Sequence, residues 1–169
     1  APEPAAAEIF RDMELTCDVE LAYERFNAEK EEDEGLQHDL LARLRAGAAK
    51  LFPGERIELE PFGSFVTELG LPAGEKGGRS DLDVVLLFHG SKADTFESKE
   101  IRPQLVLPTI DRLTAWLRTQ PGFVVKEVIR KARVPIVMFE TAQLSVDVSV
   151  QQPFGVLNSW HVRDLCQSG

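Results

Sequence analysis

Two aspartates, Asp81 and Asp83, introduce a stretch of apolar residues that runs from Val84 to Phe88. Side chains alternate along a strand, so a strand that begins here would place both carboxylates on the same face. Like charges held close together repel each other, and charges that lead into a buried strand are costly unless they are paired. A bound cation would make this arrangement tolerable.

A third carboxylate, Asp147, lies in the middle of the sequence LSVDVSV, residues 144–150. Apolar residues alternate there with Ser145, Asp147 and Ser149, which predicts a strand with Asp147 on its polar face. If this strand lies beside the one that carries Asp81, three carboxylates converge. Three hard oxygen ligands suit Mg²⁺, which commonly binds substrate phosphates as well. A site with two such ions would activate a hydroxyl and stabilise a leaving pyrophosphate.

A glycine-serine pair, Gly63-Ser64, follows the first predicted strand and opens the segment SFVTELG, which we predict to be a short helix closed by Gly70. The N-terminus of a helix offers free backbone N–H groups, which suit phosphate. Gly63 would allow a phosphate to approach the backbone, and the Ser64 hydroxyl could donate to it. The same pair is also typical of an ordinary helix cap, so the turn alone does not identify a site.

The elements that would position these residues follow from hydrophobic periodicity and from turn residues. We expect two N-terminal helices separated by Gly35, and a polar loop over residues 89–103. The last three strands are joined too tightly for parallel crossovers, which predicts an α/β domain with a mixed sheet flanked by helices. In chain order, the predicted helices and strands are helix 8–31, helix 36–51, strand 56–62, strand 82–88, a helix that starts near Pro108, and strands 123–132, 134–140 and 144–150.

The composition limits the function classes that remain. The 169 residues fit one domain, with 43% hydrophobic and 28% charged residues, and no apolar run has the length of a membrane span. The net charge of −9 counts against tight nonspecific binding of nucleic acid, although a local basic strip remains open. One such cluster contains Lys126, Arg130, Lys131 and Arg133, and its simplest interpretation is a solvated strand edge. The two cysteines and three histidines lack the spacing of a zinc site.

Together, the Gly63-Ser64 turn, Asp81-x-Asp83 and Asp147 resemble the motif of nucleotidyltransferases of the DNA polymerase beta type. The segments GRSDLDVVLLF, KARVPIVMFE and VDVSVQQPFGVLNS are similar to terminal uridylyltransferases and noncanonical poly(A) polymerases, most of all to the kinetoplastid uridylyltransferases of mitochondrial RNA editing. The resemblance extends from about Pro61 to Ser159. One departure is the longer loop between Ser64 and Asp81, which contains Lys76.

This resemblance implies a DNA polymerase beta-like fold and a template-independent transfer of UMP from UTP to an RNA 3′ hydroxyl, with release of pyrophosphate. It assigns Asp81, Asp83 and Asp147 to catalysis and to binding of Mg²⁺ or Mn²⁺. The residues that it assigns to the nucleotide are Gly63, Ser64, Ser80, Asn158 and Ser159, and those that it assigns to RNA are Arg130 and Arg133.

The resemblance also implies an arrangement of domains and a set of partners. Residues 1–55 would form helices that pack on a catalytic domain over 56–157, and 158–169 would begin a helix that leads into a second, mostly helical domain that completes the nucleotide cleft. RNA 3′ ends, including guide-type RNA, and an RNA-editing complex are the implied partners, in the mitochondrial matrix or the cytoplasm. The alternatives are an ATP-using poly(A) polymerase or oligoadenylate synthetase-like enzyme, a catalytically inactive subunit of an RNA-processing complex, and an unrelated α/β domain with surface acids.

Overall fold

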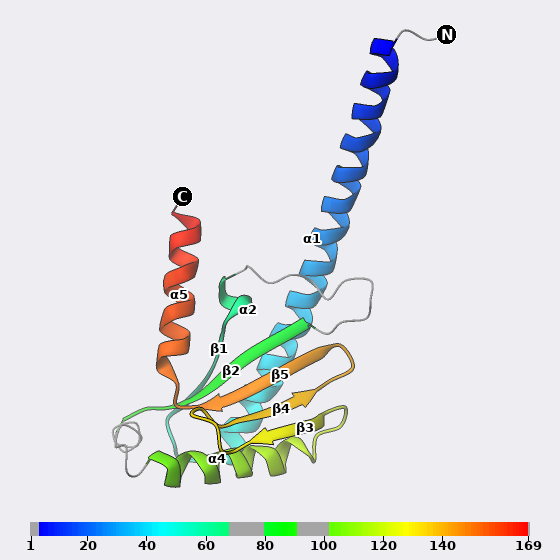
Figure 1. Ribbon diagram of the computed structural model, residues 1–169. Coiled ribbons are helices and arrows are strands. Elements are labelled where there is room, and N and C mark those ends of the chain that lie inside the picture. Colours follow the sequence, from blue (N-terminus) through cyan, green and yellow to red (C-terminus); the bar gives the residue numbers. More distant parts are fainter. Residues whose placement is uncertain (1–3, 68–79, 91–101, 169) are drawn as a thin grey trace.

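The computed structural model describes residues 4–67, 80–90 and 102–168, which form one five-stranded sheet with helices around it (Figure 1). The strand order across the sheet is β1-β2-β5-β4-β3. The elements are α1 (Pro4–Leu51), β1 (Ile57–Phe62), α2 (Ser64–Thr67), β2 (Ser80–Phe88), α4 (Arg102–Leu117), β3 (Val124–Ile129), β4 (Ile136–Glu140), β5 (Leu144–Val150) and α5 (Pro153–Gln167).

The sheet is mixed, as the sequence predicts. β2 pairs with β5 in parallel, whereas the β1–β2, β3–β4 and β4–β5 pairs are antiparallel. The tight connections among β3, β4 and β5 allow only antiparallel neighbours, which explains the orientation of these three strands. The parallel ladder runs from Ser80 opposite Leu144 to Leu86 opposite Val150, so β2 and β5 lie side by side in the centre of the sheet.

One face of the sheet carries the hydrophobic core. Alternate residues of β2 and β5, among them Val84 and Val146, are fully buried there beneath α1 and α4. Where these two helices cross, a Cβ on Gly47 would lie 2.0 Å from the Trp116 ring, so α1 needs a glycine at this position. The helical contribution to the core consists of Leu40, Leu41, Leu44 and Ala48 from α1 and Val106, Ile110, Leu113 and Leu117 from α4.

The two predicted N-terminal helices form one continuous helix, α1, so the prediction that Gly35 separates them is wrong. A glycine inside a helix costs only about 1 kcal/mol relative to alanine, and the glutamates that precede Gly35 favour helix. Packing of the following residues against the sheet offsets this cost. The N-terminal half of α1 projects beyond the sheet, as does α5 on the other side of the molecule (Figure 1).

Two further helices begin earlier than predicted. α4 starts at Arg102 and contains Pro108 in its interior. Pro103 suits the first turn of the helix. Pro108 has no N–H to donate to the carbonyl of Gln104, and Gln104 is an exposed residue that water can reach. α5 starts at Pro153, also with the proline in its first turn. None of the helices within the described residues is long and apolar enough to cross a membrane.

Candidate active site

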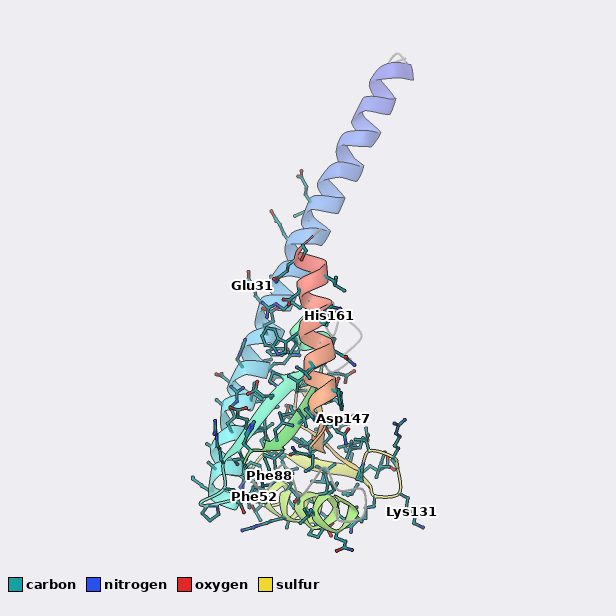
Figure 2. All side chains as sticks on the ribbon, turned by 90° about the vertical axis from the view of Figure 1, so that its left-hand side faces the viewer. Glu31, Phe52, Phe88, Lys131, Asp147 and His161 are labelled. Carbon is teal, nitrogen blue, oxygen red and sulfur yellow. The ribbon has the colours of Figure 1, made fainter. Side chains whose placement is uncertain are left out.

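The three aspartates meet on the face of the sheet opposite the core. Asp83 and Asp147 are direct partners in the parallel ladder between β2 and β5, and Asp81 precedes Asp83 by two residues on the same side of β2. The intervening Leu82 points into the core. The two strands that carry the aspartates are therefore neighbours. Figure 2 marks Asp147, away from the loop that carries Lys131.

The environment of the aspartates opposes their ionised forms. Burial raises the pKa of the Asp83 carboxyl above its ordinary value, and the charges of Asp147 and Asp81 raise it further. Burial likewise raises the pKa of Asp147, with an added contribution from the charge of Asp81. Perturbed carboxyls of this kind gather where a protein binds a cation or performs proton chemistry, because nearby positive charge relieves the repulsion.

The residues fit a divalent cation by the chemistry of their donors. Carboxylate oxygens are the preferred ligands of Mg²⁺ and Mn²⁺, and the three negative charges already repel one another. Among the residues that the structure describes, no group of three or more His, Cys, Asp or Glu side chains stands close enough together to hold a metal as it is. The carboxylates therefore lie on neighbouring strands without forming a ready metal site, and a bound cation would have to draw them closer together.

The turn between β1 and α2 lies against Asp83. Gly63 has a φ of 71°, and a Cβ at this position would lie 2.5 Å from Asp83 Oδ2. The glycine is thus required by the carboxylate beside it as well as by its backbone conformation. Its N–H donates to Ser159 Oγ at 2.8 Å, so this N–H is not open to a phosphate. Ser64 is exposed, and its hydroxyl has no partner among the described residues.

The predicted helix after this turn is a single turn, α2, within the described residues. Thr67 N–H donates to the Gly63 carbonyl at 3.1 Å, and Thr67 Oγ1 donates to the Ser64 carbonyl at 3.3 Å. The predicted end at Gly70 and the side chains of Lys76 and Ser80 lie outside what the structure describes.

The two residues of α5 that the sequence assigns to the nucleotide face different surroundings. Asn158 is exposed, whereas Ser159 is buried, with 7% of its surface accessible. The Ser159 hydroxyl donates to the Gly155 carbonyl at 2.9 Å and accepts from Gly63. A Cβ on Gly155 would lie 3.3 Å from the Phe62 ring, so α5 approaches β1 closely here.

The two arginines assigned to RNA also differ. Arg130 forms an ion pair with Asp111 of α4, with N–O distances of 2.6 and 3.1 Å, on the side of the sheet that faces away from the aspartates. Arg133 is exposed on the β3–β4 loop. Lys126 pairs with Glu140 at 3.3 Å. The basic cluster is thus partly neutralised along the strand edge, in line with the simpler interpretation of its sequence.

Two glutamines that the sequence did not single out bond to the backbone of β2. Gln37 of α1 is buried, and its Nε2 lies 3.4 Å from the Asp81 carbonyl. The sequence signal for Gln37 was a polar residue among the leucines on one face of an amphipathic helix. Gln151 has a φ of 51°, and its side-chain oxygen accepts from the Phe88 N–H at 2.8 Å where the chain turns from β5 into α5. No local sequence pattern predicts this second contact.

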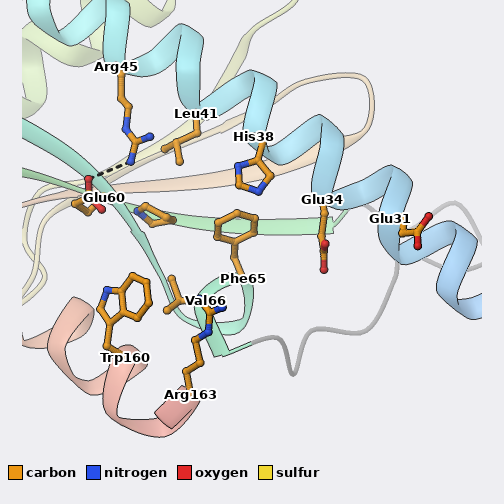
Figure 3. A pocket seen from close by; sticks show the side chains of 11 residues that line it. Glu31, Glu34, His38, Leu41, Arg45, Glu60, Phe65, Val66, Trp160 and Arg163 are labelled. Atoms are coloured by element: carbon orange, nitrogen blue, oxygen red, sulfur yellow. Dashed lines mark hydrogen bonds and ion pairs between the residues drawn. The ribbon is translucent and has the colours of Figure 1, made fainter. Parts of the chain in front are cut away.

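A cavity of about 710 Å³ lies next to the turn, between α1, β1, α2 and α5 (Figure 3). Its lining is both aromatic and charged, and an ion pair of 3.0 Å between Arg45 and Glu60 stands at one end. Trp160 contributes to this lining from α5, while the three aspartates do not take part. The remaining lining residues are Glu31, Glu34, His38, Leu41, Pro61, Phe65, Val66 and Arg163.

Comparison with known families gives one match that covers most of the chain. Residues 15–163 match the family described as poly(A) RNA polymerase, mitochondrial-like, central palm domain. No curated protein is similar enough in sequence to be matched.

Solved structures agree with this chain in fold. The GLD-2/RNP-8 complex aligns with a TM-score of 0.66 and 15% identity over 86% of this chain and 53% of that one. The structure of mtPAP in complex with CTP aligns with a TM-score of 0.62 and 24% identity over 79% of this chain and 28% of that one. Terminal uridylyl transferase 4 from Trypanosoma brucei with bound UPU gives 0.57 and 24% over 75% and 38%. The chain thus spans between 28% and 53% of the length of these three structures.

Proposed function

This chain belongs to the family of central palm domains of mitochondrial-like poly(A) RNA polymerases, and from that membership we propose that it is the catalytic palm of a template-independent RNA 3′-terminal nucleotidyltransferase. The transferred group is UMP, taken from UTP. The oxygen of the RNA 3′ hydroxyl attacks the α-phosphate, the bond to the β-phosphate breaks, and pyrophosphate leaves. The observation that carries this proposal is the direct pairing of Asp83 with Asp147 beside Asp81.

Each aspartate has a proposed role. Asp81 and Asp83 hold the metal, and Asp147 completes the set and helps to activate the attacking hydroxyl. A carboxylate with a raised pKa is a better base than an ordinary one, which suits Asp147 to this role. Bound Mg²⁺ or Mn²⁺ would supply neutralisation of the phosphate charge and activation of the hydroxyl.

The remaining assignments concern binding. We assign the triphosphate to the turn of Gly63 and Ser64 together with Ser80, with the exposed Ser64 hydroxyl as donor. Asn158, exposed on α5, is assigned to the ribose and base, and Arg133 to the RNA. A second, helical domain completes the cleft from residues 158–169 onward, and an RNA-editing complex in the mitochondrial matrix or cytoplasm is the proposed setting.

A second candidate is an adenylyltransferase, a poly(A) polymerase that uses ATP. The description of the matched family favours it, because that family is named for poly(A) synthesis. The metal and phosphate residues would serve both nucleotides equally, since they contact no base. The choice between the two reactions therefore depends on groups that contact the base edge.

The test is an extension assay with the full-length protein, a short single-stranded RNA, Mg²⁺ and each nucleoside triphosphate in turn. Extension with UTP alone supports the first candidate, and extension with ATP alone supports the second. Asp147→Asn should reduce either activity at least about a hundredfold, because it removes charge where the transition state needs it. Asp164→Asn, an exposed aspartate on α5, is the matched control. Equal extension by Asp147→Asn and the control would remove Asp147 from catalysis.

A further inference from the structure

We propose that Gln151 is a positioning residue, which acts on the nucleotide site through the direction in which α5 leaves the sheet. The proposal rests on the proposed function, because α5 carries Asn158, which is assigned there to the ribose and base. Gln151 lies between the end of β5 and the start of α5. Its side chain ties this junction to the neighbouring strand β2 by two hydrogen bonds.

The side-chain amide of Gln151 replaces backbone groups that the β2–β5 ladder lacks at its end. The Gln151 N–H still donates to the Leu86 carbonyl at 2.9 Å, as a continued parallel ladder requires. One step further, such a ladder would bond the Phe88 N–H to the Gln151 carbonyl, and the Phe88 carbonyl to the N–H of residue 153. Residue 153 is a proline and has no N–H. Instead, the Gln151 side-chain oxygen accepts from the Phe88 N–H at 2.8 Å, and its Nε2 donates to the Phe88 carbonyl at 3.3 Å.

These two bonds satisfy backbone groups that lie away from water. Phe88 is 1% exposed, and buried N–H and carbonyl groups are costly when they lose their partners. Gln151 reaches them with a φ of 51°, and no other non-glycine residue within the described ranges has a positive φ. Glycine or asparagine would adopt this conformation more readily. The glutamine at this position is therefore explained by the contacts of its side chain.

The junction bears on the proposed function because it joins the strand of one catalytic carboxylate to the helix of the nucleoside contact. Asp147 precedes Gln151 on β5, and Asn158 is exposed on α5 beyond it. The N-cap residue Gln152 makes no side-chain cap bond that would orient the helix. A displaced junction would therefore shift Asn158, whereas Asp83 and Asp147 would stay paired in the ladder.

The experiment replaces Gln151 with asparagine in the full-length protein. Asparagine tolerates a positive φ, but its side chain is one methylene shorter and would not reach both groups of Phe88. Gln143→Asn, the same change at an exposed glutamine between β4 and β5, is the matched control. Hydrogen exchange reports the Phe88 amide, and the RNA extension assay gives KM and kcat for the nucleotide at a temperature where denaturant curves show all variants folded.

Gln151→Asn should speed exchange of the Phe88 amide and raise KM for the nucleotide about tenfold. It should leave kcat within about twofold of the wild type, because the metal-binding carboxylates keep their places on the strands. Gln143→Asn should change neither quantity. If Gln151→Asn does not fold, Gln151→Gly takes its place, because glycine removes the backbone strain together with the amide.

A double variant tests whether Gln151 acts through Asn158. Asn158→Ala alone should raise KM for the nucleotide, and the addition of Gln151→Asn should then raise it by less than about twofold more, since both changes remove the same contact. A residue with a purely structural role would give effects that multiply.

Other results would overturn the proposal. A wild-type KM in Gln151→Asn with faster Phe88 exchange would limit Gln151 to a structural contact, and unchanged Phe88 exchange would show that its side chain does not protect this amide. Effects on KM that multiply in the double variant would exclude action through Asn158. A wild-type protein that extends no RNA, while Phe88 exchange still responds to Gln151→Asn, would contradict the proposed function and leave Gln151 with a structural role only.

Discussion

At the level of single residues, ionisation of Asp83 and Asp147 works against folding. Both carboxyls have a pKa above the ordinary 3.8 because they are partly buried and face other negative charges. The folded chain therefore binds protons at these sites more tightly than the unfolded chain does. Their contribution to stability is fully favourable below pH 3.8 and is lost as the pH rises through the raised pKa values. Residues that destabilise the fold in this way are typical of functional sites.

The first prediction is that Asp83→Asn stabilises the protein at neutral pH while it abolishes transfer. The amide removes a charge that is both partly buried and repelled, so the free energy of unfolding at pH 7 should exceed that of the wild type. Urea denaturation between pH 4 and pH 7 should show a decline in wild-type stability that is smaller in the variant. A variant less stable than the wild type at pH 7 would mean that the Asp83 carboxylate makes a favourable contact.

The second prediction concerns the cation. Mg²⁺ should raise the thermal unfolding midpoint of the wild type, because an ion that binds only the folded chain stabilises it by about 2.7 kcal/mol at one hundred times its dissociation constant. Asp83→Asn and Asp147→Asn should lose most of this response, and Asp164→Asn should keep it. The same concentration of charge supplied as KCl controls for screening. An equal response in all four proteins would show that Mg²⁺ does not bind at the three aspartates.

At the level of elements, the β1–α2 turn lies in close steric contact with the Asp83 carboxylate. Its glycine has a left-handed backbone and borders the Asp83 carboxylate, whereas Gly54 has a similar φ of 80° with no atom within 4 Å of where a Cβ would be. A side chain at Gly54 would cause backbone strain alone, whereas a side chain at Gly63 would cause the same strain and also collide with the Asp83 carboxylate. The same substitution at both positions measures what the closeness to Asp83 contributes.

The third prediction uses this pair. Gly54→Ala should cost about 1 kcal/mol of stability from backbone strain and leave transfer intact. Gly63→Ala should cause the same backbone strain and also displace the Asp83 carboxylate. Transfer should therefore fall at least about a hundredfold. Denaturant unfolding and the RNA extension assay measure the two effects. Equal losses of activity in both variants would show that strain alone explains the need for glycine at position 63.

The sequence predicted those parts of the site that depend on local pattern. Alternation within each strand fixed the face of Asp83 and Asp147, and the short connections among the last strands fixed their orientation. The break expected at Gly35 was wrong because tertiary packing outweighed the weak propensity of one glycine. The bond between Ser159 and Gly63 joins residues 96 positions apart, and no pattern in a short window reports such a contact.

At the level of the whole molecule, the described residues provide three carboxylates and the Gly63-Ser64 turn, while the exposed apolar side chains of α5 have no cover among them. Phe154, Leu157 and Leu165 are 74%, 61% and 61% exposed. A nucleobase is usually held by an aromatic ring and by hydrogen bonds to its edge. Of the two tryptophans, Trp116 is packed on Gly47 and Trp160 lines the cavity beside α1.

The fourth prediction follows from this division. The 169-residue chain alone should bind Mg²⁺–nucleotide weakly, discriminate little between UTP and ATP, and extend RNA poorly. Base choice and full activity should appear when the second domain is present, on the same chain or as a partner. Calorimetry of UTP against ATP on the 169-residue chain provides the measurement. Tight, UTP-selective binding would place the base pocket within these residues.

The parallel ladder between β2 and β5 also determines when, during folding, Asp83 and Asp147 are brought together. Across it, the Ser149 hydroxyl donates to the Val84 carbonyl although the two residues are 65 positions apart, so the chain must close a long loop before these strands pair. Contacts of this range form slowly compared with hairpins such as β3–β4 and β4–β5. During synthesis, a nascent chain cannot assemble the three carboxylates until β5 has left the ribosome. An incomplete chain therefore lacks the pairing of Asp83 with Asp147.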